Sequence, residues 1–196
     1  MGWDPDTPRI ATPAYPCLID DSHQIAEPYG IINVPTAVWI DEQGKIVRPP
    51  DSAGACDAFR AMDRTTFRMP SDHAARARDE RKSYLAAVRD WIENGAASRY
   101  VLPDHKLRRL LHDPDRDSQL AAARFRLGLE LNLMGSTQEA QSQFAEAQRL
   151  SPQNWSYKRQ AWELEQAGKA AGPEFWSAVD ALGDKHYYPP APLAGD

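Results

Sequence analysis

The period of the hydrophobic residues changes near residue 60, and this change constrains the fold more than any other feature of the sequence. Before it, short apolar runs bounded by turn residues are typical of buried strands. After it, apolar residues recur every three or four positions, which is typical of amphipathic helices. The sequence therefore predicts an α/β segment over residues 1–66, followed by an all-α domain over residues 67–186.

The first segment carries three candidate strands. Two apolar runs, residues 15–20 and 36–40, indicate buried strands. Residues 41–44 are polar and end in glycine, so we expect a turn there. Residues 45–48 then return as a third strand, and the last two strands form a β-hairpin. With a short helix that ends at Gly30, the predicted order is β-α-β-β.

The residues just before that helix allow two interpretations. Asp20, Asp21 and His23 could support acid–base or metal chemistry. Asp21 and Ser22 are better explained as residues that cap the helix. We therefore predict no metal site.

The second segment is almost entirely helical by its hydrophobic period. Residues 72–94 form a long amphipathic helix that ends at Gly95. A shorter helix over 106–112 and a longer one over 118–134 follow. The Pro-rich tail, residues 187–196, has no period, so we expect it to be extended or disordered.

Seven small or apolar residues in the C-terminal half have the spacing of a two-helix hairpin. They are Leu127, Gly128, Leu131, Ala140, Phe144, Ala147 and Pro152. This spacing resembles a tetratricopeptide repeat, here one hairpin over residues 121–154. The resemblance implies a groove that holds a peptide or a protein. The alternative is a helical cap that buries its own aromatic side chains.

The motif Tyr29-Gly30-x-x-x-Val34-Pro35-Thr36 stands before the predicted hairpin. With the apolar run before it and the hairpin after it, residues 14–50 resemble the C-terminal half of a thioredoxin fold. The most similar groups are the TlpA/ResA thiol-disulfide reductases and the AhpC/TSA-type redoxin family. The resemblance implies a truncated thioredoxin-like sheet that lacks the first β-α-β unit.

The same resemblance implies where a substrate binds. Pro35 would follow a cis peptide bond, and Val34, Pro35 and Thr36 would bind an extended substrate segment. The alternative is that Pro35 merely begins a strand. The Cys-x-x-Cys motif of the family is absent, so the candidate catalytic thiols are Cys56 and Cys17. Cys17 has a simpler interpretation as a small hydrophobic residue inside a strand.

A sheet without its first half has an open edge and an open face. The helical domain could fold over the sheet, or two chains could pair edge to edge as a homodimer. A third explanation is that the sequence begins after its native start, for example because a selenocysteine codon was read as a stop.

Two functions remain open at this point. The first is membership of the thiol-disulfide oxidoreductase family, without activity in this chain alone. The second is a non-catalytic binding or scaffold protein that uses the helices. Both imply a protein or peptide partner, which for the first carries a thiol or disulfide.

The composition limits the classes of partner and the cellular location that we expect. The net charge of -5 disfavours nucleic-acid binding, and no apolar run is long enough to cross a membrane. We expect no cofactor. The cytoplasm is the expected location, with an extracytoplasmic one if an N-terminal region is missing.

Overall fold

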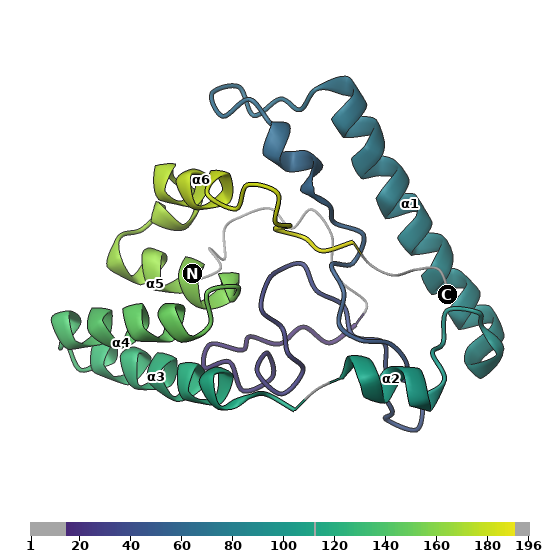
Figure 1. Cartoon of the computed structure of the whole chain (residues 1–196), viewed down its shortest axis with the longest axis horizontal. Coiled ribbons are helices and arrows are strands. Elements are labelled where there is room, and N and C mark those ends of the chain that lie inside the picture. Colours follow the sequence, from purple (N-terminus) through teal and green to yellow (C-terminus); the bar gives the residue numbers. More distant parts are fainter. Residues whose placement is uncertain (1–14, 112, 191–196) are drawn as a thin grey trace.

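The structure is a computed structural model that describes residues 15–111 and 113–190, and this part of the chain is helical (Figure 1). Within these residues, six α-helices and three short 3-10 helices follow one another. They are η1 (Asp57–Ala61), α1 (Ser71–Asn94), η2 (Gly95–Ala97), α2 (Asp104–Leu110), α3 (Arg116–Leu133), α4 (Thr137–Leu150), α5 (Trp155–Glu165), η3 (Lys169–Ala171) and α6 (Pro173–Asp180). No helix in these two ranges is long and apolar enough to cross a bilayer.

The predicted α/β segment is wrong, because the described residues contain no sheet. Two isolated antiparallel bridges remain of it, between Ala37 and Asp51 and between Ile40 and Ile46. The hairpin turn itself is confirmed, since the Asp41 N–H donates to Lys45 O at 2.9 Å. A β-strand forms only when it shares backbone hydrogen bonds with a neighbouring strand. Residues 15–20 form no backbone–backbone hydrogen bonds with other described residues. The thioredoxin-like resemblance is therefore overturned.

Two helical layers flank a central region of irregular chain. Figure 1 shows α3–α6 on one side, α1 on the other and the loops of residues 28–52 between them. Trp39 joins these loops to α1, because its Nε1 donates to the Tyr84 hydroxyl at 2.8 Å and its ring stacks on Trp91. The predicted start and end of α1 are both confirmed to within one residue.

The predicted hairpin of residues 121–154 is present as α3 and α4, which pack around a core that includes Phe125, Phe144 and Tyr157. Gly128 lies where the helices cross, since a Cβ atom there would come within 2.5 Å of the Phe144 ring. A small residue at this position is what close helix contact requires. The geometry is that of an ordinary helical hairpin and identifies no family.

A third core gathers aromatic residues from distant parts of the chain. Trp155, Val179 and Tyr187 are buried together, with Phe59 packed against them. Tyr187 is only 2% exposed, so the beginning of the predicted extended or disordered tail is folded into this core. Residues 191–196 of that tail lie outside the described residues.

Candidate functional site

A cavity of about 520 Å³ lies between residues 23–32, α3 and the start of α5. We call it the His23 cavity. Its wall on the α3 side is made partly of the small residues Ala122 and Ala123, and Ile31 and Ile32 line the opposite side. A concave space with apolar walls and a few polar groups is the usual form of a binding site.

The wall formed by residues 23–32 is held in place by turns that Asp20 stabilises. Asp20 Oδ2 accepts hydrogen bonds from the N–H groups of Ile25 and Ala26 at 2.9 and 2.8 Å. Burial raises the pKa of Asp20. These two bonds and one from the Gln24 amide together lower it by more, so the pKa of Asp20 is below its usual value. The cap predicted for Asp21 and Ser22 is thus supplied by Asp20, and the predicted helix is a series of turns.

Charged and polar side chains join this wall to the helices. Glu27 forms an ion pair with Arg126 of α3 and accepts a hydrogen bond from the Tyr157 hydroxyl of α5 at 3.0 Å. Burial, followed by the Glu27 charge, raises the pKa of Tyr157. His23, which is 8% exposed, is hydrogen-bonded through Nε2 to the Gln160 side chain and packs edge-on against Phe125. The charged groups at the back of the cavity are therefore already paired.

Asn154 provides a polar group that is still available for a ligand. It is only 6% exposed and lines the cavity, and its Oδ1 caps α5 by accepting from the Tyr157 N–H at 3.1 Å. Since only the oxygen can accept, the carboxamide orientation is fixed. Its NH₂ group has no acceptor among the residues that the structure describes. Asn154 as a residue is nearly buried, but this nitrogen is not among the fully buried unpaired side-chain atoms, so it reaches the cavity, where water or a ligand can accept from it.

The predicted substrate residues lie outside the His23 cavity. The Val34–Pro35 bond is cis, as expected. However, the Val34 N–H donates to Asn33 Oδ1 at 2.9 Å, and the Val34 carbonyl accepts from the Tyr188 hydroxyl at 2.8 Å. An incoming strand would have to displace both groups. Thr36 is turned back on the same loop, because its Oγ1 donates to Asn33 O at 2.6 Å. Substrate binding by these three residues stays a prediction.

The structure brings one predicted thiol close to Pro35 and leaves the other apart. Cys56 and Pro35 line a smaller cavity of about 380 Å³, together with Arg78 and Arg81 of α1. Cys17 is exposed, so its interpretation as a residue inside a buried strand is wrong. Both cysteines are free thiols. A catalytic role for either stays a prediction.

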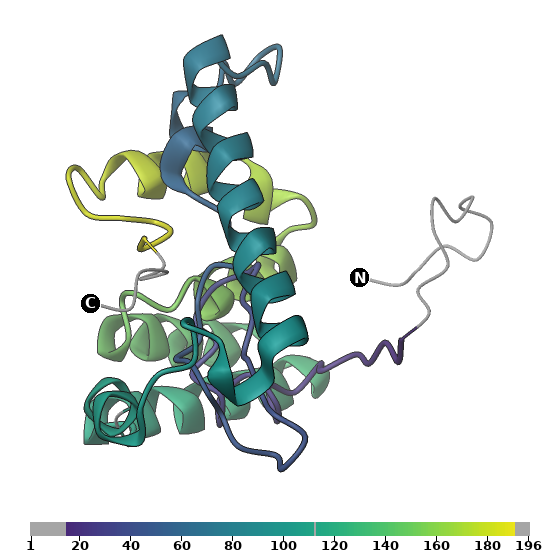
Figure 2. The same ribbon diagram turned by 90° about the vertical axis from the view of Figure 1, so that its right-hand side faces the viewer.

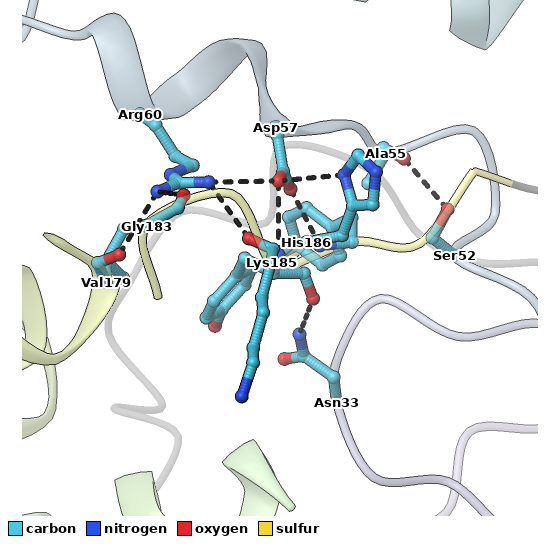
Figure 3. A network of polar contacts seen from close by, with 11 residues as sticks. Asn33, Ser52, Ala55, Asp57, Arg60, Val179, Gly183, Lys185 and His186 are labelled. Carbon is cyan, nitrogen blue, oxygen red and sulfur yellow. Dashed lines mark hydrogen bonds and ion pairs between the residues drawn. The ribbon is translucent and has the colours of Figure 1, made fainter. Parts of the chain in front are cut away.

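The segment after α6 is bound by polar contacts to η1 and to Asn33 (Figure 3). Asp57 of η1 accepts hydrogen bonds from the backbone N–H groups of Tyr187 and Tyr188 at 3.1 and 2.7 Å. Arg60, also of η1, donates to the Val179 carbonyl near the end of α6 and to the carbonyls of Gly183 and Lys185 after it, the Gly183 bond being 2.8 Å long. These bonds hold Tyr188 against the Val34 carbonyl, which explains why that carbonyl is not open to a partner.

Sequence reasoning missed Arg126, Tyr157 and Asn154, because they line the same cavity as residues 23–32 but lie about a hundred or more residues further along the chain. One local signal was available, since an Asn two residues after a helix-ending Pro152 is a typical helix N-cap. That signal predicts the start of α5, but no feature of the sequence places it beside residues 23–32.

Comparison with known proteins adds no further assignment. No family model matches this chain, and neither a curated protein nor a solved structure does. The structure therefore identifies a helical protein with a candidate binding cavity and no assigned family.

Proposed function

We propose that the protein is a non-catalytic binding protein, and that the His23 cavity holds a peptide segment of a partner protein. The observation that carries this proposal is the side chain of Asn154, which lines the cavity and whose NH₂ group donates to no described residue. A peptide carbonyl is the most common acceptor that a protein partner can offer.

The remaining walls favour a peptide over a charged small molecule. Glu27 and Arg126 already neutralise each other, so this pair leaves no charge that awaits an ion. Ala122 and Ala123 leave room for an apolar side chain beside the peptide backbone. The expected ligand is thus an extended peptide with one apolar side chain in the cavity and one carbonyl bonded to Asn154.

The alternative function, membership of the oxidoreductase family, gains no support from the arrangement of the thiols. It rested on a resemblance to a sheet that the described residues do not form. The cytoplasmic location stays a prediction.

The test is a selection of displayed random peptides on the purified protein. The variant Ala123→Trp fills the cavity from α3, and Ala86→Trp adds the same side chain to an exposed position of α1 as the control. We expect the enriched peptides to bind the wild type and Ala86→Trp equally, and to lose binding to Ala123→Trp.

A second variant tests the Asn154 bond itself. Asn154→Asp keeps an acceptor that caps α5 equally well, but it replaces the NH₂ donor with an oxygen. Leaving the peptide carbonyl without its donor costs about 1–3 kcal/mol, which weakens the binding of the selected peptides by about 5- to 150-fold. Peptides that bind both variants as tightly as the wild type, or a selection without enrichment, would refute the proposal.

A further inference from the structure

Residues 15–19 form an apolar segment that lies apart from the helices. Figure 2 shows this part of the chain, in purple, leading away from the body of the protein. Tyr15, Leu18 and Ile19 are 71%, 85% and 79% exposed. None of the five residues forms a backbone–backbone hydrogen bond with another described residue. The Cys17 thiol donates weakly to the Tyr15 carbonyl at 3.9 Å, a contact that a stronger N–H donor of a partner can replace. The segment therefore offers a partner both apolar side chains and backbone groups that no other backbone group of the described chain bonds.

The position of Pro16 decides which edge of this segment a partner can use. In an extended chain the N–H and C=O groups of residues 15, 17 and 19 point to one edge, and those of residues 16 and 18 point to the other. Pro16 has no N–H, so the second edge lacks a donor. Only the edge of Tyr15, Cys17 and Ile19 can form a complete ladder of hydrogen bonds.

This edge is complementary to itself. In an antiparallel pair centred on Cys17, each Tyr15 lies opposite Ile19 of the second copy, and aromatic residues pair favourably with β-branched ones. The acidic residues Asp20 and Asp21 then lie at opposite ends of the pair. In a parallel in-register pair, Asp20 would lie opposite Asp20 of the second copy and Asp21 opposite Asp21. Like charges opposite one another are destabilising.

We propose that a second copy of this chain is the partner of residues 15–19, and that the two segments pair as antiparallel strands about a twofold axis through Cys17. Such an interface is isologous, because each copy presents the same edge. Asp20 fixes the base of the segment through its bonds to Ile25 and Ala26. This dimer goes beyond the proposed function and does not depend on the His23 cavity.

The dimer is expected to be weak and reversible. Five residues on each side bury much less than the roughly 800 Å² per partner of a standard stable interface. A two-stranded ribbon is also marginal in water. Association should therefore rise with protein concentration, and sedimentation equilibrium over a wide concentration range measures it directly.

Two proline variants provide the decisive comparison. Ile19→Pro removes a donor from the pairing edge, whereas Leu18→Pro removes one from the edge that already lacks a donor at Pro16. Both variants lose one exposed aliphatic side chain outside the helices, so both should keep the wild-type circular dichroism. We expect Ile19→Pro to be a monomer at every concentration and Leu18→Pro to dimerise to a similar extent as the wild type.

Cross-linking supplies a second readout of the register. In a Cys56→Ser background the remaining thiols are Cys17 and Cys17 of the second copy, which the proposed pair places opposite each other. A short thiol-specific cross-linker should give a covalent dimer that Ile19→Pro abolishes. A wild type that stays monomeric, or the same result for both proline variants, would overturn the proposal.

Discussion

Gly128 is expected to be one of the least replaceable residues of the helical hairpin. A Cβ atom added there would lie 2.5 and 2.6 Å from two carbons of the Phe144 ring. Phe144 is 4% exposed, and its ring lies against that of Phe125, with 5.1 Å between their centroids. The ring cannot move away without disturbing the core that α3 and α4 share.

The expected size of the effect of Gly128→Ala follows from two opposing contributions. Adding a methyl group to a well-packed core costs about 1–3 kcal/mol, and here the buried ring places it near the upper end. Replacing glycine by alanine in a helix interior stabilises the helix by about 1 kcal/mol. The net loss in the free energy of unfolding is about 2 kcal/mol, or about 4–8 °C in Tm for a chain of this length.

Urea denaturation followed by circular dichroism measures this loss, and Phe144→Leu is the matched background. The shorter side chain vacates the space beside Gly128, so the same substitution should there be neutral or stabilising by up to about 1 kcal/mol. A Gly128→Ala variant as stable as the wild type, or an equal loss in both backgrounds, would refute the close crossing of α3 and α4.

Two further predictions concern the segment after α6. Asp57→Asn should lower the free energy of unfolding by about 1–3 kcal/mol, because one of the two N–H groups loses its acceptor. Thermal denaturation checks this, with the exposed Asp184→Asn as control, and equal Tm values would contradict it. Burial, followed by contact with Tyr187, raises the pKa of Tyr188 to about 12. Its contribution to stability is therefore complete below about pH 10 and falls as the pH rises toward 12; Tyr188→Phe should remove this loss, and an unchanged alkaline transition would contradict the assignment.

The helical half could be predicted from sequence because its signals are local. Residues 72–94 have a regular period of 3.6, and Gly95 with a positive φ ends α1 as expected. The pair of Gly128 and Phe144 also follows from spacing, since each residue lies on the buried face of its own helix. In a helical hairpin with a short loop, most packing contacts join residues that are close in the sequence.

The first half could not be predicted in the same way. A short apolar run such as residues 15–19 has the composition of a strand, but a strand also needs a partner, which composition does not supply. Val34 illustrates the same point, because its carbonyl is taken by Tyr188, a residue 154 positions later. The His23 cavity depends on contacts of similar range, so no local motif could identify it.

The central claim is that Asn154 donates to a peptide bound in the His23 cavity. Nuclear magnetic resonance tests it most directly, because the side-chain NH₂ of Asn154 gives a pair of signals that the Asn154→Asp variant identifies by their absence. Addition of a selected peptide is predicted to shift this pair. A peptide that binds the protein but leaves both signals unchanged would contradict the claim.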